Sequence, residues 1–498
     1  MKRNIGWLLC AVNLLAPRSV AVGQQVLRFD SAYVNQGSGW ALGVSVFERD
    51  SGYLVFSVQK TWPFDDGSQD IYSSTYDTLG RWQQDRALVT ERSDWIGNYS
   101  PVARSLTGDF YTGYNRFTGD DQDSLFLLKW DENGDTIWNR FLEVDETYTV
   151  RATAFTHDST LLLTGNHEPP LNAYIYEVDT MGVVLGFHTY PGFYPEDVAV
   201  GADGAWYVSG QGFQTNIYGR SVLIRTNTLG SEVWRRTDTT YGNSFQLVPT
   251  RDSCIVVLGW RSEAETPARA KLVKYDPMGV QQWMKEPYSA DFDEVPCYLH
   301  AGFEDPDGTF IVAGQVRDTT YGQAGMLFKL DSEGNTIWQR FYAHYPSFLI
   351  NDDQIFNDVK RTSDGGLILT GETNGGEHPY AQLWLLKLDS AGCLVPGCGS
   401  VGVEEYTDLF QGQLQVWPNP TSERVQVSLT LPEGFATRGA VQLYLMDAQG
   451  RIVGQQVAQQ NFNVITGAME LSAHPRGTYY LHLADSKRWL AGGKLVVE

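Results

Sequence analysis

The sequence lacks most of the signatures that mark an enzyme active site. Its eight histidines are scattered without the spacing of metal ligands. No Gly-x-Ser-x-Gly elbow, HExxH motif or phosphate-binding loop is present. Catalytic residues can converge from distant segments, so these absences argue against an enzyme without excluding one.

Basic residues are in short supply. Lys and Arg number 37 against 59 Asp and Glu, which gives a formal net charge of -22. Residues 24–402 contain 50 of the acidic and 27 of the basic side chains, so this region carries nearly all of the negative charge. Such a surface repels nucleic-acid phosphates, and no nucleic-acid partner is expected. It suits cations or neutral ligands, or serves solubility alone.

Long apolar runs are also missing, and no segment can span a membrane. The short apolar run from Ile5 to Leu15 follows Lys2 and Arg3 and is followed by the small residues 21–23. This order predicts a signal peptide over residues 1–23, with Gln24 as the mature start.

What the sequence does contain is a repeat. An Asp-x-x-Gly corner follows an apolar run and often precedes a Trp, as in Asp131 to Gly134 and Trp138. The corner glycines are residues 80, 134, 182, 230, 279, 334 and 392, with spacings between 48 and 58. Glycine supplies the positive φ that such a hairpin corner needs. A self-similar unit of this length indicates a repeat architecture.

Each repeat holds a second hairpin, read most clearly at Asp203-Gly204, Asp307-Gly308 and Asp364-Gly365. Variants begin at residues 51, 108, 159 and 253. Two hairpins make four strands, so the sequence predicts an all-β fold with a seven-bladed β-propeller over residues 24–398. The text after Gly392 is a poor strand, whereas residues 26–29 resemble the outer-strand text at 337–341. We therefore expect the mature N-terminus to supply the last outer strand and close the ring.

Loop lengths predict which face binds a ligand. Both tight corners of every repeat lie on one side of the disc, which we call the turn face, and the long variable connections lie on the other, the long-loop face. Binding function concentrates on such loops. Candidate ligand-binding aromatics there are Trp62, Phe64, Tyr114, Phe213, Tyr218, Tyr321, Tyr345 and Tyr380. Clustered aspartates offer a candidate Ca²⁺ site, with solvated turn residues as the alternative: Asp65, Asp66, Asp70, Asp120, Asp121 and Asp123. No other cofactor is predicted.

Two further residue sets have structural interpretations. Trp138, Trp234, Trp283 and Trp338 recur at one place in the repeat, which favours packing between blades over sugar binding. Cys393 and Cys398 bracket four residues, and an exported chain meets an oxidising compartment, so we expect a disulfide between them. Whether Cys254 and Cys297 pair stays open at this stage.

The chain changes character after a linker at residues 399–411. Residues 412–498 read as short strands and turns, which predicts a small Ig-like β-sandwich. Four ordered motifs occur in it: Trp417-Pro418-Asn419-Pro420, then Asp447 to Gly450 and Arg451, then Gly477-Thr478-Tyr479, then Lys494 to Glu498. This unit resembles the type A sorting domain of the type IX, or Por, secretion system. The resemblance implies Sec export, type IX machinery as a partner, and a secreted or cell-surface location.

The repeats themselves resemble SBBP-type and PQQ-like bacterial propeller repeats, which occur in proteins of many functions. The sequence therefore supports two functions. The first is a surface module that binds an extracellular glycan or protein. The second is an extracellular hydrolase or lyase with carboxylates in the central mouth of the propeller; a pocket with two close carboxylates of opposed pKa shifts would favour it.

Overall fold

A computed structural model describes residues 28–33, 38–61, 69–88, 94–96, 101–117, 123–142, 147–168, 172–213, 219–263, 267–287, 296–318, 322–344, 353–375, 378–394, 404–406, 414–431, 437, 439–447, 451–485 and 488–498. The predicted signal peptide lies outside these residues. The regular structure of the described residues is all β, with no helix. A membrane-spanning helix is accordingly not found in these ranges.

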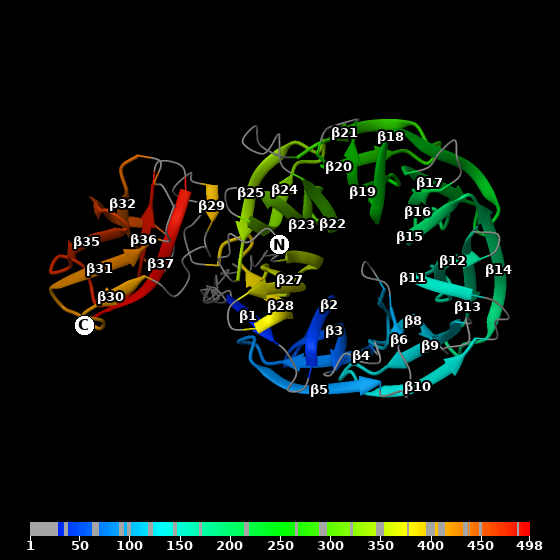
Figure 1. The fold of residues 1–498 in the computed structure, drawn as a ribbon, viewed down its shortest axis with the longest axis horizontal. Coiled ribbons are helices and arrows are strands. Elements are labelled where there is room, and N and C mark those ends of the chain that lie inside the picture. The colour runs from blue at the N-terminus through cyan, green and yellow to red at the C-terminus, as the bar shows by residue number, and fades with distance from the viewer. Residues whose placement is uncertain are drawn as a thin grey trace, which may run out of the picture.

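The first part of the chain forms a β-propeller, in which small antiparallel sheets stand around a ring (Figure 1). Its first three sheets contain β2 (Ser38–Arg49), β3 (Gly52–Thr61), β4 (Asp70–Tyr76) and β5 (Trp82–Leu88); β6 (Asp94–Trp95), β7 (Ala103–Arg104), β8 (Phe110–Phe117), β9 (Asp123–Trp130) and β10 (Thr136–Phe141); and β11 (Thr147–Phe155), β12 (Leu161–Glu168), β13 (Asn172–Val178) and β14 (Val184–Pro191).

The ring continues with a seven-stranded sheet, β15 (Phe193–Val200), β16 (Trp206–Gly212), β17 (Arg220–Thr226), β18 (Glu232–Pro249), β19 (Ile255–Ser262), β20 (Arg269–Tyr275) and β21 (Gln281–Lys285). The long strand β18 is the outer strand for β17 and the innermost strand for β19, so two repeats share it. After it come β22 (Cys297–Glu304), β23 (Phe310–Asp318), β24 (Gly322–Leu330) and β25 (Thr336–Tyr342), then β26 (Gln354–Arg361), β27 (Leu367–Gly375) and β28 (His378–Leu388).

The Asp-x-x-Gly corners have the predicted geometry. All seven corner glycines have a positive φ, between 73° and 82°. In the corner that starts at Asp331, its Oδ1 accepts the backbone N–H groups of Glu333 (3.0 Å) and Asn335 (2.8 Å). The aspartate therefore satisfies the backbone of the turn, which explains why Asp or Asn begins each corner.

Neighbouring repeats are held together at these corners. The rings of Trp138, Trp234, Trp283 and Trp338 each lie against the corner glycine of the next repeat, so closely that a Cβ on that glycine would fall within 3.7 Å of the ring. The residue two positions further on is a cation that contacts the same corner. Arg236 donates to the Gly279 carbonyl (2.7 Å) and stacks over Trp234 (5.1 Å), and Lys285 donates to Asn335 Oδ1 (2.8 Å). Four repeats thus pack an aromatic ring against the corner of their neighbour, and three of them add a hydrogen-bonded cation there.

The ring closes through the N-terminal segment. β1 (Phe29–Tyr33) pairs antiparallel with β28 as the outer strand of the β26–β28 sheet. This pairing confirms the predicted origin of the strand, although it begins at Phe29 rather than before it. Arg28 forms an ion pair with Asp389 (2.8 Å). On the inside of the ring, Asp358 Oδ2 accepts the Val46 N–H (2.9 Å), which joins the last repeat to the first.

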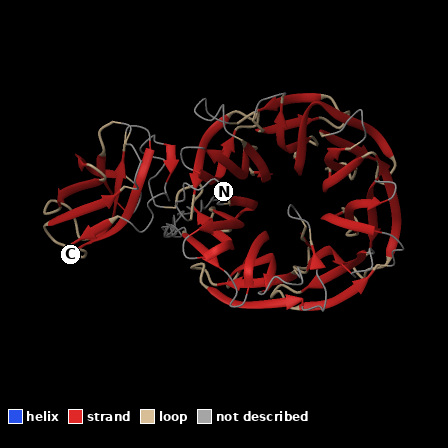
Figure 2. Cartoon of the chain, in the orientation of Figure 1, coloured by secondary structure: helices blue, strands red, loops and turns tan. Residues whose placement is uncertain are grey.

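Two further antiparallel sheets follow the propeller (Figure 2). One contains β30 (Gln415–Trp417), β31 (Arg424–Thr430), β35 (Val464–Glu470) and β34 (Gln459–Asn461). The other contains β33 (Ile452–Val457), β32 (Gln442–Asp447), β36 (Gly477–Ala484) and β37 (Arg488–Val497). Buried residues of both sheets, among them Val427, Leu443 and Leu481, share one core, so the unit is a β-sandwich. Within the predicted linker, β29 (Glu404–Tyr406) pairs parallel with both β25 and β37.

Candidate functional site

The predicted ligand-binding aromatics fall into two groups. Trp62, Phe64, Tyr218, Tyr321 and Tyr345 lie outside the described residues. The remaining three are described. Phe213 directly follows β16 and packs on Tyr194 with 5.5 Å between ring centroids. Tyr380 is exposed on β28. Tyr114, by contrast, is fully buried, and its hydroxyl accepts the Asn139 amide (2.7 Å), so it is a core residue and leaves the candidate set.

Most of the predicted acidic cluster cannot be placed. Asp65, Asp66, Asp120 and Asp121 lie outside the described residues, Asp70 begins β4, and Asp123 begins β9. Across the described part of the chain, no group of three or more His, Cys, Asp or Glu side chains has metal-binding geometry. The Ca²⁺ site therefore stays a prediction.

The innermost strands share a feature that the sequence did not reveal. Six of them shift register at the same place, with one extra residue in each: Val44, Arg151, Glu196, Phe245, His300 and Asn357. Such a β-bulge re-aims a side chain and is common beside functional sites. We call these six residues the bulge ring, because each lies next to the innermost strand of the following repeat.

Contacts within the bulge ring differ from one repeat to the next. Glu196 accepts a hydrogen bond from Asn243 Nδ2 (3.2 Å). The Phe245 ring meets His300 edge-on, with 5.1 Å between centroids. His300 Nδ1 lies 3.3 Å from the Phe356 carbonyl, and Asn357 Nδ2 donates to the Gly43 carbonyl (3.0 Å). One structural position therefore holds a cation, an acid, an aromatic ring, an imidazole and an amide in turn.

Burial perturbs the ionisable groups near the inner ends of the repeats. It raises the pKa of Glu196, against the opposing effects of the Arg151 charge and the Asn243 hydrogen bond. It lowers the pKa of His300 to about 4, so this imidazole is neutral at pH 7. Burial and the neighbouring Asp353 carboxylate raise the pKa of Glu372 to about 8.

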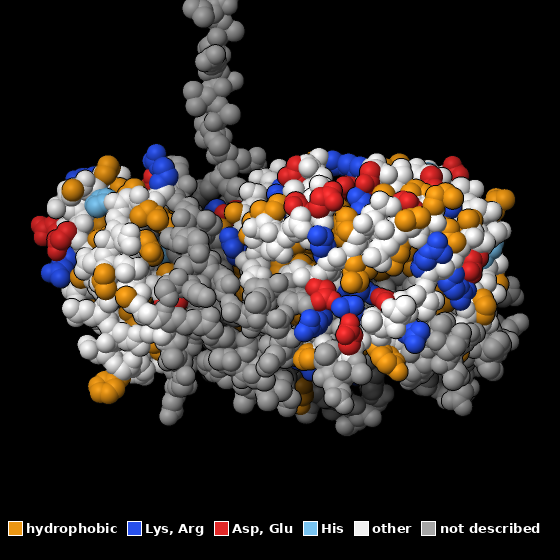
Figure 3. Space-filling view, turned by 90° about the horizontal axis from the view of Figure 1, so that it is seen from above, with side chains coloured by type: hydrophobic (Ala, Val, Ile, Leu, Met, Phe, Trp, Pro, Cys, Tyr) orange, Lys and Arg blue, Asp and Glu red, His pale blue; other side chains and the backbone are white. Residues whose placement is uncertain are grey.

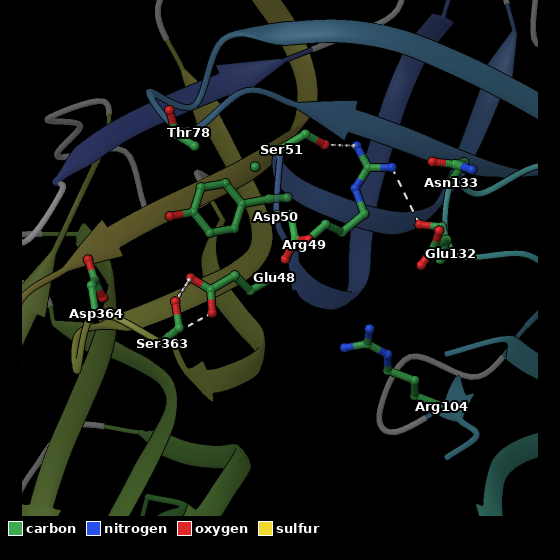
Figure 4. A pocket seen from close by; sticks show the side chains of 12 residues that line it. Glu48, Arg49, Asp50, Ser51, Thr78, Arg104, Glu132, Asn133, Ser363 and Asp364 are labelled. Carbon is green, nitrogen blue, oxygen red and sulfur yellow. Dashed lines mark hydrogen bonds between the residues drawn. The ribbon is translucent and has the colours of Figure 1, made fainter. Parts of the chain in front are cut away.

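A cavity of about 710 Å³ opens on the turn face, where the β2–β3 turn meets the β26–β27 turn. We call it the turn-face cavity. Its walls are Glu48, Arg49, Asp50, Ser51, Gly52, Tyr53, Thr78, Arg104, Glu132, Asn133, Ser363 and Asp364. Figure 4 shows Arg49 and Arg104 on one side, and Glu48, Ser363 and Asp364 on the other. The loop lengths in the sequence favoured the opposite, long-loop face for ligand binding.

Elsewhere on the turn face, several turn aspartates form ion pairs, and side chains of both signs are interspersed on the described part of the propeller's side that Figure 3 shows. A turn aspartate pairs with a cation on the third strand of its own repeat: Asp203 with Arg225 (2.5 Å), Asp252 with Lys274 (2.6 Å), Asp307 with Lys329 (3.5 Å) and Asp364 with Lys387 (3.0 Å). The equivalent position of the first repeat, set by its pairing with Leu54, is Thr75. The first repeat therefore lacks the cation that neutralises its turn.

The structure describes three of the cysteines discussed above. Cys393 is disulfide-bonded, and its predicted partner Cys398 lies outside the described residues. Cys254 and Cys297 are both free, so they do not pair with each other.

The four C-terminal motifs meet at one end of the sandwich. Asn419 forms two hydrogen bonds with the backbone of the last strand. Its Nδ2 donates to the Lys494 carbonyl (2.8 Å), and its Oδ1 accepts the Val496 N–H (3.0 Å). Pro418 and Pro420 flank it, each after a cis peptide bond. Across the second sheet, Asp447 pairs with Tyr479, which pairs with Leu495.

Turn contacts complete this arrangement. Asp447 accepts the Arg451 N–H (3.0 Å) and Nε–H (2.6 Å), and the Tyr479 hydroxyl donates to the Pro475 carbonyl (2.8 Å). Gly477 pairs with Val497. Gly450 lies outside the described residues. The motifs thus build one surface around the terminal strand.

Residues 415–498 match the family model of the secretion system C-terminal sorting domain. The sandwich is a C-terminal sorting domain. Its presence assigns the chain to export by the type IX secretion system, to the cell surface or the extracellular space. The motifs around Asn419, Asp447 and Tyr479 lie within the matched residues.

Ahead of the sorting domain, the propeller has structural neighbours at low identity. A Dos1 propeller shares 11% identity and a TM-score of 0.36, over 75% of this chain and 93% of that one. The β-propeller domain of the Trilobed protease from Pyrococcus furiosus shares 12% identity and a TM-score of 0.41, over 69% of this chain and 95% of that one. No curated protein matches the chain in sequence.

Proposed function

We propose that this chain is an exported seven-bladed β-propeller that binds an extracellular ligand, glycan or protein, and that an Ig-like sorting domain delivers it. The strand grouping supports the blade count: β2–β5, β6–β10, β11–β14, β15 to the first half of β18, the second half of β18 to β21, β22–β25, and β26–β28 with β1. The order of strands and the paired edge of the last sheet fit a closed ring.

The bulge ring carries the binding proposal. Positions that serve the architecture keep one chemistry from repeat to repeat, as the corner glycines and the cations after Trp do. The bulge position instead changes from Arg151 to Glu196, Phe245, His300 and Asn357. A repeat protein diverges where structure does not require sameness, and binding surfaces occupy such positions. A ligand would enter from the long-loop face, where Phe213 and Tyr380 lie.

Binding of the exported chain to glycan and extracellular-protein arrays tests this proposal. Phe213→Ala, Tyr380→Ala and Glu196→Gln should each weaken binding of the ligand found, by about tenfold where the group contacts it. Ile137→Ala, at an exposed outer-strand position, is the control. Binding that survives these changes but vanishes with changes at the Asp-x-x-Gly corners would contradict the proposed face.

A Ca²⁺ ion at the predicted aspartate cluster belongs to the same proposal. Carboxylates from two neighbouring long loops would hold it, and it would order those loops against the ligand. Removal of Ca²⁺ with EGTA should then lower the melting temperature and weaken binding, and added Ca²⁺ should restore both. Unchanged melting in EGTA would leave the aspartates as solvated loop residues.

The second candidate function is an extracellular hydrolase or lyase. Glu372 favours it, because this carboxyl has a pKa of about 8 and lies near Asp353, which contacts Arg317 at 3.9 Å. A protonated carboxyl beside an ionised one is the pairing that acid–base catalysis uses. Release of reducing ends from polysaccharides, lost in Glu372→Gln, would support the enzyme.

A further inference from the structure

Equivalent positions on the turn face show how one repeat normally meets the next. In three repeats a charged residue at or next to the end of the innermost strand contacts the turn of the preceding repeat. Glu48 accepts the Ser363 N–H (2.6 Å) and hydroxyl (3.0 Å), and Glu304 accepts the Arg251 N–H (2.8 Å). Arg361 forms an ion pair with Asp305 in the preceding turn. At each of these junctions a charged side chain meets a complementary group.

The second repeat breaks this rule. Arg104 occupies the same ladder position, since it pairs with Phe110 as Glu48 pairs with Tyr53. The turn it faces, between β2 and β3, presents another cation, Arg49. Among the described residues Arg104 has no hydrogen bond or ion pair, and its guanidinium contacts only the face of Phe110 (5.4 Å). Two guanidinium groups therefore face one cavity, whereas at the equivalent junction of the last repeat the arginine, Arg361, meets an acid, Asp305.

Arg49 is incompletely satisfied. Its Nη groups reach the Glu132 carbonyl (3.4 Å) and the Ser51 hydroxyl (3.2 Å), while its Nε is buried without a hydrogen-bond partner. Burial, and then the charge of Arg86, lower its pKa, against the opposing charges of Asp131 and Glu132. A buried guanidinium nitrogen without a partner costs free energy that a bound anion would recover.

The nearby acids cannot supply the missing partner. Both Glu48 oxygens accept hydrogen bonds from Ser363. Asp364 is held by Lys387 (3.0 and 3.1 Å) and by the Gly366 N–H (2.9 Å). Neither acid therefore gives the buried Nε of Arg49 a hydrogen bond, and Arg104 is exposed. Asp50 and Glu132 are exposed at the margin, where water solvates them.

We propose that the turn-face cavity is a binding site for a polar organic anion, held through its carboxylate or sulfate group by Arg49 and Arg104. A guanidinium matches the two oxygens of such a group by paired hydrogen bonds. The cavity volume of about 710 Å³ accommodates a sugar-sized body, and Ser51, Thr78 and Asn133 supply hydroxyl and amide groups for its polar atoms. This site lies on the face opposite the long loops, and so is separate from the ligand site proposed above.

Titration calorimetry of the full exported chain with sodium glucuronate, sodium sulfate and glucose tests the proposal. We expect saturable binding of glucuronate or sulfate, which also identifies the anionic group, and no binding of glucose. Arg49→Gln and Arg104→Gln should each weaken anion binding by about tenfold or more. Arg251→Gln, a turn arginine of another repeat, should bind as wild type does. Absence of saturable binding for both anions would overturn the proposal.

Charge reversal sharpens the test. Arg104→Glu recreates the acid that Glu48 and Glu304 provide, so it should pair with Arg49, raise the melting temperature and abolish anion binding. If Arg104→Glu and Arg104→Gln both bind glucuronate or sulfate as tightly as wild type, the arginines do not hold the anion and the proposal fails.

Discussion

At the scale of the residue, the contact between an outer-strand Trp and the corner of the next repeat is a recurring contact that holds neighbouring repeats together. Trp338 is half-buried against Gly392 and under Arg340, whose guanidinium lies 5.2 Å from the ring. We expect Trp338→Ala to lower the free energy of unfolding by about 3 kcal/mol, because it empties the space between two repeats. Denaturant unfolding measures this, with the exposed neighbour Ile337→Ala as a control that should change by less than about 0.5 kcal/mol.

Glu372 makes a second prediction, on pH. Its pKa of about 8 in the folded chain lies above the unfolded value of about 4.3. The folded state therefore holds a proton that the unfolded state releases, so the contribution of Glu372 to stability is complete below pH 4 and is lost as the pH rises towards 8. Glu372→Gln cannot ionise and should become progressively more stable than wild type from pH 5 to pH 8.

Unfolding free energies at pH 5, 6.5 and 8 measure this effect. Asp252→Asn is a control of opposite sign. Burial alone would raise the pKa of Asp252, but Lys274 and Thr250 outweigh it and bring the value to about 2. Asp252→Asn should therefore lose stability at neutral pH relative to wild type, and the difference should shrink as the pH falls from 4 to 2. A pH-independent difference for Glu372→Gln would show that its carboxyl titrates normally.

At the scale of the element, β1 is the strand on which closure depends. It pairs with β28 from Phe29 to Tyr33, and Asp30 Oδ1 accepts the Trp384 indole N–H (2.7 Å). Deleting residues 24–33 exposes the edge of β28, so we expect a lower melting temperature and aggregation. A melting temperature equal to that of wild type would mean that β1 does not close the ring. Deletion of residues 24–27 alone, which spares β1, is the matched control.

Elements with local signals could be predicted from the sequence, and those set by tertiary contact could not. The Asp-x-x-Gly corners could be predicted because four consecutive residues determine their backbone geometry. In the corner from Asp331 to Gly334, the glycine adopts the positive φ and the aspartate accepts a backbone N–H group. The bulges have no such local sequence signal. An extra residue such as His300 can be recognised only when its strand is aligned with the partner strand, here β23. Tyr114 shows the same limit, since loop proximity in sequence suggested exposure and the fold buries it.

The candidate sites also differ in whether local sequence or tertiary contact defines them. The C-terminal motifs are short and ordered, so the sequence could identify the domain that contains them, and Asn419 contacts Lys494 in the structure. The turn-face cavity stands out in a comparison between repeats: Thr75 occupies a position where four other repeats have a paired cation, and Arg104 faces Arg49 where Arg361 faces Asp305. Sequence alone gives those residues, but only the ladder register shows that they are equivalent positions.

At the scale of the whole molecule, the propeller and the sorting domain have different roles. The propeller holds the bulge ring and the turn-face cavity, and the sorting domain directs export. One core cluster and strand β29 join the two parts, but the propeller also has cores confined to its own strands and its own closing strand, so it should fold without the sorting domain.

Localisation of a truncated chain tests this division most directly. In a bacterium that has type IX secretion, the wild-type chain and a form without residues 415–498 would be followed by fractionation and by protease accessibility on intact cells. We predict that the wild type reaches the cell surface or the medium, and that the truncated form accumulates in the periplasm with a folded, protease-resistant propeller. Delivery of the truncated form to the surface at the wild-type level would contradict the account.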